Sequence, residues 1–201
     1  MILKFNNFID NLNDSFKERA ILFYGNNIGK IDYCIKALVS KKKQNSKVNV
    51  IHKYTDEMKP GDIEDVIEKN SGVDLFGNNT LVILHLYSEK LSKEIMKNLS
   101  NIKSKSLLLI IRSQQLNPNS LIRKHFEQAK NLSIVPCYEE TLFEKKKIIE
   151  NFFESENINV SENFKLNFCR RLSNHRVEIE NELKKVFFLS NGNPNQIESF
   201  A

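Results

Sequence analysis

The sequence predicts a three-layer α/β domain with a mostly parallel sheet, followed by a small domain of three helices. Two observations lead to this prediction. Short apolar runs alternate with helical patterns up to about residue 140, and only helical patterns follow. Strand–helix–strand repetition favours right-handed crossovers that place helices on both faces of a parallel sheet. We therefore expect an α/β domain over residues 1–140 and a helical lid domain over residues 141–201.

Five short apolar runs, each bounded by polar or turn residues, are the expected strands of the first domain. At least two are apolar nearly throughout, which is typical of strands buried on both faces of a parallel sheet. Segments with helical spacing lie between them, such as SLIRKHFEQAK at residues 120–130. The expected strands are residues 20–25, 47–54, 79–87, 106–112 and 132–138.

Three helices are expected after residue 140, each beginning at a polar capping residue. Thr141 followed by Glu144 is the sequence of a capping box. Ser161 is the expected cap of the second helix, and Asn174 that of the third. The apolar residues expected to face inward are Leu142, Ile149, Phe152 and Phe153, then Phe164, Phe168 and Leu172, then Ile179, Leu183 and Phe187.

The charge balance is mildly basic. Lys and Arg total 30 and Asp and Glu total 25, so the net charge is +5. A dedicated nucleic-acid-binding protein usually has a more concentrated basic surface. The clusters Lys41–Lys43 and Lys145–Lys147 are better explained as solvated faces of helices and loops.

Cysteine and histidine are scattered along the chain, with no CxxC pair and no second ligand at metal-binding spacing. This distribution indicates neither a disulfide framework nor a metal site, and it fits a reducing compartment. No apolar run reaches about 18 residues, and the N-terminus has no signal-peptide pattern. We expect a cytoplasmic protein with no membrane partner.

FYGNNIGKI at residues 23–31 has the position of a phosphate-binding loop, between an apolar run and a helical pattern. A working loop reads G-x-x-x-x-G-K-[ST], in which the lysine reaches phosphate oxygens and the hydroxyl binds magnesium. Alignment on Gly29 and Lys30 puts Tyr24 at the first glycine position and Ile31 at the hydroxyl position. A tyrosine would crowd the turn and isoleucine cannot bind magnesium, so we expect no nucleotide site. Lys30 is expected to be a solvated lysine in a first helical turn.

The acidic residue that would hold magnesium at the end of the third strand is also missing. His85, Leu86 and Tyr87 stand where an acid is required, and Glu89 comes too late. The sequence therefore predicts no catalytic residue and no cofactor.

Four stretches, in order along nearly the whole chain, resemble the delta subunit of the bacterial DNA polymerase III clamp loader. They are LFYGNNIGKIDYCIKAL, DLFGNNTLVIL, LIRKHFEQAKNLSIVPCY and HRVEIENELKKVFFL. The resemblance implies an AAA+-like first domain without a working nucleotide site, followed by a helical lid. It also implies an accessory subunit of a DNA-directed DNA polymerase holoenzyme, which binds and opens the sliding clamp during DNA replication without hydrolysing ATP.

The same resemblance implies the partners and the contact residues. The partners would be the sliding clamp (the beta subunit), the gamma/tau and delta prime subunits, and, indirectly, primed DNA. The family's clamp-binding apolar pair falls on Leu75 and Phe76. From the residues alone, a Leu-Phe pair between Ser71-Gly72 and Gly77-Asn78-Asn79 is either a plug at the end of the sheet or an exposed interface anchor. The resemblance favours the anchor.

Two departures from the family pattern affect the expected assembly. Val135-Pro136-Cys137 stands where ATP-hydrolysing sister subunits carry a Ser-Arg-Cys finger, so we expect no arginine finger in trans. The family also has a third, helical domain that forms the pentameric collar, and the 201 residues end before it. The sequence is expected to be an N-terminal fragment or a shortened version, and assembly with the other subunits to need that third domain.

Two other functions are compatible with the same sequence. One is an ATP-hydrolysing AAA+ clamp-loader-type subunit with an atypical loop, which Tyr24, Ile31 and the missing acid oppose. The other is a basic DNA-binding module, which needs a basic face interleaved with aromatic residues, and the sequence shows no such face.

Overall fold

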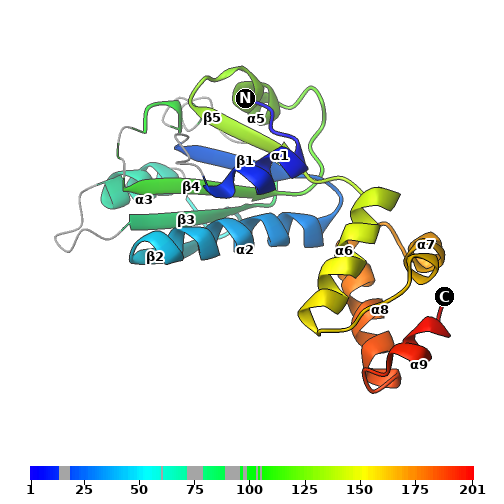
Figure 1. Cartoon of the computed structure of the whole chain (residues 1–201). Coiled ribbons are helices and arrows are strands. Elements are labelled where there is room, and N and C mark those ends of the chain that lie inside the picture. The colour runs from blue at the N-terminus through cyan, green and yellow to red at the C-terminus, as the bar shows by residue number, and fades with distance from the viewer. Residues whose placement is uncertain are drawn as a thin grey trace. The chain divides into compact units, whose positions relative to one another are not determined.

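The computed structural model describes residues 1–13, 19–59, 61–71, 79–88, 96, 99–102, 104 and 106–201 (Figure 1). By its internal contacts the chain divides into two compact units. The first contains residues 1–26 and 31–137, and the second contains residues 27–30 and 138–201. The second unit is therefore discontinuous in sequence.

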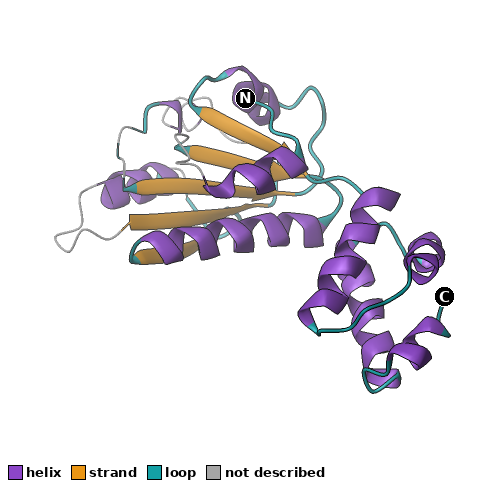
Figure 2. Cartoon of the chain, in the orientation of Figure 1, coloured by secondary structure: helices purple, strands orange, loops and turns teal. Residues whose placement is uncertain are grey.

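A five-stranded sheet, parallel throughout, forms the centre of the first unit, with the strand order β2-β3-β4-β1-β5. Figure 2 shows the strands as orange arrows with helices above and below them. Nearly every residue of β1, β4 and β5 is buried, as expected of parallel strands covered on both faces. The strands are β1 (Ala20–Tyr24), β2 (Val48–Tyr54), β3 (Asn79–Leu86), β4 (Leu107–Ser113) and β5 (Leu132–Pro136). All five expected strands are confirmed.

Helices cover both faces of the sheet, which confirms the three-layer α/β fold (Figure 1). α1 (Phe5–Asp10) and α2 (Ile28–Asn45) lie on one face, where Phe8 and Leu38 are among the side chains that pack with the sheet. A single 3-10 turn, Asn11–Asn13, follows α1. On the other face lie α3 (Asp62–Ser71), with Ile63 inward, and α5 (Leu121–Gln128), with Ile122 and Phe126 inward.

The second unit is helical, and its elements are α6 (Leu142–Ser155), α7 (Glu162–Arg171), α8 (Arg176–Leu189) and the short α9 (Pro194–Glu198). Both expected caps of the first two helices are confirmed. The hydroxyl of Thr141 accepts from the backbone N–H of Glu144, whose carboxylate accepts from the N–H of Thr141, and Ser161 caps α7. The fourth helix, α9, was not predicted; Asn193 caps it and Pro194 begins it.

The predicted start of α8 is wrong. The helix begins at Arg176, with His175 at the cap position and no capping side-chain bond there. The side chain of Asn174 is used elsewhere: its oxygen accepts from the ammonium of Lys145 at 3.0 Å, and its amide donates to Glu139 at 3.2 Å. The requirement to bond a buried lysine therefore outweighs the local capping preference.

One apolar cluster fills the second unit, and it includes most of the side chains predicted to face inward. Leu142 is an exception: it is 60% exposed in the first turn of α6. Phe152 and Phe187 are half-buried. The remaining predicted members are buried: Ile149, Phe153, Phe164, Phe168, Leu172, Ile179 and Leu183. No helix in the described part of the chain is long and apolar enough to cross a membrane.

Candidate functional site

The loop at the carboxyl end of β1 is the candidate site, because open α/β sheets bind ligands at the carboxyl ends of their strands. β1 ends at Tyr24 and α2 begins at Ile28. The tyrosine ring does not crowd this loop, contrary to the prediction. It is buried in the cluster on the α5 face, and the guanidinium of Arg123 lies 5.3 Å from its centroid. Ile31 is fully buried on the α2 face.

The two glycines of the loop are required by close packing within each unit. Gly25 has φ +148°, and a Cβ there would lie 2.1 Å from the carbonyl oxygen of Cys137. A Cβ on Gly29 would lie 2.6 Å from a methyl carbon of Val177 and 2.9 Å from its backbone nitrogen. All three distances are shorter than a Cβ atom tolerates. The glycines thus have a structural reason to be present that involves no phosphate.

Lys30 is buried, not solvated as predicted, with an exposed fraction of 3%. Its ammonium donates to Glu144 Oε1 at 2.9 Å and lies 2.9 Å from Glu140 Oε2. The Glu140 contact is an ion pair outside hydrogen-bond geometry. Both carboxylates come from the chain around the start of α6, more than a hundred residues away, so no local pattern could indicate them.

Arg176, at the start of α8, completes the ion cluster. Its Nε donates to Glu140 Oε1 at 2.9 Å, and its guanidinium also lies 3.8 Å from Glu180. Its backbone N–H donates to the side-chain oxygen of Asn27 at 3.2 Å, and the N–H of Lys30 approaches the same oxygen at 3.3 Å. The sequence pattern had assigned Arg176 no role.

Each cation in this cluster is paired with at least one carboxylate. Burial opposes ionisation of Glu144, but the backbone N–H of Thr141 and the ammonium of Lys30 outweigh it, so the pKa of this carboxyl is lowered. The carboxylates of Glu140 and Glu144 lie against the two cations, Lys30 and Arg176. A working phosphate loop instead offers net positive charge and free N–H groups. The arrangement is suited to holding the chain together rather than to binding an anion.

At the carboxyl ends of β2 and β3, aromatic rings stand where a magnesium-holding acid is needed. His85 stacks on Tyr54 at 4.5 Å between centroids, and its Nε2 lies 3.1 Å from His52 Nδ1. Burial, then the nearby Arg112, then His52 lower the pKa of His85, so its ring is neutral at physiological pH. Among the described residues, no group of three or more His, Cys, Asp or Glu side chains could hold a metal ion.

The predicted clamp-binding residues, Leu75 and Phe76, lie outside the described residues. The described chain stops at Ser71, where α3 ends, and resumes at Asn79, where β3 begins. Asn79 is at the amino end of its strand, paired with Val48.

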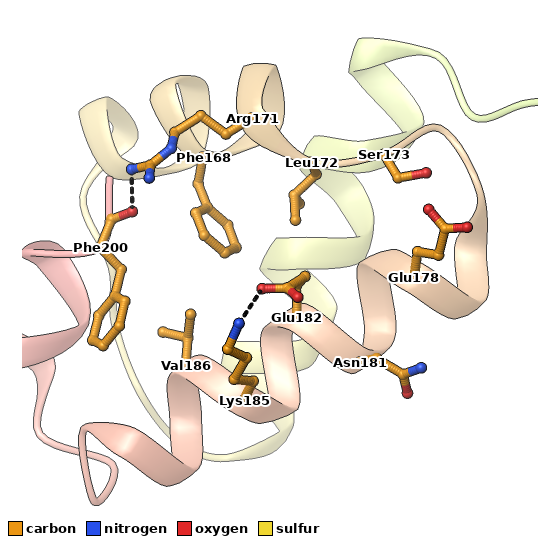
Figure 3. A pocket seen from close by; sticks show the side chains of 10 residues that line it. All are labelled: Phe168, Arg171, Leu172, Ser173, Glu178, Asn181, Glu182, Lys185, Val186 and Phe200. Carbon is orange, nitrogen blue, oxygen red and sulfur yellow. Dashed lines mark hydrogen bonds and ion pairs between the residues drawn. The ribbon is translucent and has the colours of Figure 1, made fainter.

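A groove of about 590 Å³ crosses α7 and α8 in the second unit (Figure 3). Apolar side chains, among them Phe168 and Val186, form part of its lining, and both signs of charge lie around them. Lys185 pairs with Glu182, and Arg171 donates to the backbone oxygen of Phe200 at 2.7 Å. The groove lining therefore carries charges of both signs.

No protein-family model matches the chain, and no curated protein matches it by sequence. Solved structures do match. The Bacillus subtilis DNA clamp loader delta protein has a TM-score of 0.58 at 13% identity, over 94% of this chain and 59% of that one. Domain III of the Thermotoga maritima replication initiation protein DnaA has a TM-score of 0.56 at 12% identity, over 93% and 82%.

The Thermotoga maritima RuvB Holliday junction branch migration motor matches equally well, with a TM-score of 0.57 at 11% identity, over 96% of this chain and 66% of that one. The chain thus spans about three fifths of the length of the delta protein that it matches. At these identities the similarity concerns the fold alone. The first unit and the helices after it have an AAA+-like fold.

Proposed function

We propose that this chain is a non-catalytic clamp-loader subunit of the delta type, which binds and opens the sliding clamp for loading onto primed DNA in the cytoplasm. The fold does not distinguish this function from that of an ATP-driven relative, because the delta protein and the RuvB motor match it equally well. The observation that carries the proposal is the pairing of Lys30 with Glu140 and Glu144, which removes the cation that a nucleotide would need.

Leu75 and Phe76 are the proposed clamp anchor. The support is the resemblance in sequence and the turn residues on both sides of the pair. An aromatic side chain offers a large contact area and has few rotatable bonds to immobilise. Such residues therefore contribute much of the binding energy at interfaces. The beta clamp would be the direct partner, and the gamma/tau and delta prime subunits would join it in the complete loader.

The test is binding of the full chain to the immobilised sliding clamp of the same organism. We expect the Leu75→Ala, Phe76→Ala double variant to lose binding by about thirtyfold, or about 2 kcal/mol, at an unchanged melting temperature. The matched control is Phe188→Ala, Leu189→Ala, which removes a second apolar pair, 74% and 61% exposed, from the end of α8 and should leave binding intact. If the pair is a core plug, the first double variant will instead lose roughly 3 to 5 kcal/mol of stability.

An ATP-hydrolysing subunit remains the competing enzymatic function, and titration with a fluorescent ATP analogue and magnesium tests it directly. We expect no saturable binding at micromolar concentration. Binding that is saturable and is lost on Lys30→Ala would contradict the proposal, because it would require the ammonium of Lys30 to leave both carboxylates.

One observation favours a DNA-binding role as a second candidate. The rings of Tyr54 and His85 stack beside Tyr87, which is 60% exposed. Arg112 of β4, which is paired with Asp32 at 2.8 Å, lies next to His85 in register. Unpaired bases stack on such rings. Retention of single-stranded DNA that weakens with salt and falls in Tyr87→Ala would support this role; retention unchanged by that substitution would exclude these rings as the contact.

A further inference from the structure

Two cations at the starts of two helices converge on one buried carboxylate. Lys30 lies in the first turn of α2, Arg176 begins α8, and Glu140 precedes α6. The two oxygens of Glu140 are divided between them: Oε1 accepts from Arg176 Nε at 2.9 Å, and Oε2 lies 2.9 Å from Lys30 Nζ. The side chain of Glu140 is completely buried.

The other groups that could bind an anion at this place are also engaged. Asn27, which is fully buried, presents its side-chain oxygen to the backbone N–H groups of both Lys30 and Arg176. The amide of Asn27 donates to the carbonyl oxygens of Tyr138 and Asn174 at 3.3 and 3.4 Å. An ammonium, a guanidinium and the N–H groups at two helix starts are the parts from which oxyanion sites are built.

We propose that Glu140 is a built-in anionic ligand. Its carboxylate occupies the position between Lys30 and Arg176 that a phosphate-type oxyanion would otherwise take, and Glu144 supplies the second negative charge that Lys30 requires. Burying these ions is costly unless each is paired, so the cluster is maintained only as a complete set. The inference does not depend on clamp binding.

The consequence is that residues 27–30 hold their place in the second unit with no external ligand. In a phosphate site these groups would change their contacts each time the ligand binds or leaves. Here the carboxylate of Glu140 takes the place of the ligand and is covalently part of the chain, so its effective concentration at the site is constant. The second unit is then in a permanently liganded arrangement that nucleotide levels cannot change.

Chemical rescue tests the proposal. Glu140→Ala in the full chain removes the carboxylate and leaves two buried cations beside an empty space. We expect the melting temperature to fall by roughly 5 to 15 °C. Added acetate or inorganic phosphate should then restore most of that loss, rising with the logarithm of anion concentration, whereas equal chloride should not.

Comparison with three further proteins makes the result decisive. The wild-type chain should gain nothing beyond the general effect of salt, and neither should Glu182→Ala, which removes an exposed carboxylate paired with Lys185. Combining Glu140→Ala with Lys30→Met should abolish the rescue, since one of the two cations is then absent. The proposal would be overturned if added anions raised the melting temperature of Glu140→Ala no more than that of Glu182→Ala. It would also be overturned if Glu140→Ala were as stable as the wild type.

The outcome is informative even if Glu140→Ala does not fold in dilute buffer. Folding recovered by acetate or phosphate, followed by circular dichroism, would support the proposal. Failure of both anions to recover folding would overturn it. Because none of these measurements uses the sliding clamp, a negative result here leaves the proposed clamp-opening function separately testable.

Discussion

At Gly29, the absence of a side chain allows the first turn of α2 to approach the start of α8. We expect Gly29→Ala to lower the stability of the second unit by roughly 1 to 3 kcal/mol, because the new Cβ would meet both the side chain and the backbone of Val177. Thermal unfolding measures the change. Adding Val177→Ala removes the side-chain clash and should restore part of the loss. A stability equal to that of the wild type would show that the close packing is not real.

Lys30 offers a second prediction at the residue scale. Removing its charge by Lys30→Met leaves the buried Glu140 with one partner fewer, which costs about 3 to 5 kcal/mol in such pairs. The exposed Lys53 is a matched control, and Lys53→Met should change the free energy of unfolding by less than about 0.5 kcal/mol. Urea unfolding compares the two variants. If the two substitutions have equal effects, Lys30 is solvated, as its sequence context predicts, and not buried.

Single residues were predictable where the requirement is local. Ile31 lacks a hydroxyl in any structure, so the missing magnesium ligand could be identified from the sequence. The burial of Lys30 could not, because Glu140 and Glu144 approach it only after the chain has folded across more than a hundred residues. The ring stack of Tyr54 and His85 likewise depends on the β2–β3 register, which apolar patterning does not specify.

At the scale of helices, α6 and α7 are joined by a surface network in which Glu162 contacts both Lys146 and Lys165. Hydrogen bonds from Lys146, then Lys165, lower the pKa of Glu162 from 4.5 to about 2. A carboxyl group whose pKa is lowered by folding stabilises the folded state at pH values above its pKa in the unfolded chain. This stabilisation is lost as the pH falls through its pKa in the folded state. We therefore expect Glu162→Gln to be less stable than the wild type at neutral pH. The difference in stability between the two proteins should vanish as the pH falls from 4.5 towards about 2.

The same network should be sensitive to salt because Glu162 is exposed. Melting temperatures of the wild type and Glu162→Gln, measured at low and high ionic strength, should converge at high salt. If the wild type and Glu162→Gln still differ in stability at low pH and at high salt, these charges are not the cause of the difference.

Elements were predicted well where their signals are local in sequence. The capping box of Thr141 and Glu144 marks the start of α6, and the apolar runs mark all five strands. The start of α8 was predicted incorrectly, because Asn174 bonds Lys145 across the unit instead of capping the helix. Helix α9 was missed because it is only five residues long, too short for a periodic pattern.

At the scale of the whole molecule, the two units cannot be separated by one cut in the sequence, since residues 27–30 belong with residues 138–201. We expect a fragment of residues 138–201 to unfold at a lower temperature than the same helices in the full chain. The fragment lacks Lys30 and Asn27, so Glu140 and the backbone of Arg176 lose partners. Hydrogen exchange of α6 and α8 amides measures this, and equal protection in both proteins would contradict it.

Gly25 shows how packing alone can fix a glycine in a loop of this kind. Its lack of a side chain is imposed by the carbonyl of Cys137, at a backbone angle that L-residues rarely adopt. Mutation at this position is therefore opposed by the architecture itself, whether or not any nucleotide is ever bound. Glycines spaced as in a phosphate loop can thus be required by packing alone. Glycine spacing after the first strand is therefore insufficient evidence for a nucleotide site, and the side chains that face the lysine of the loop have to be examined as well.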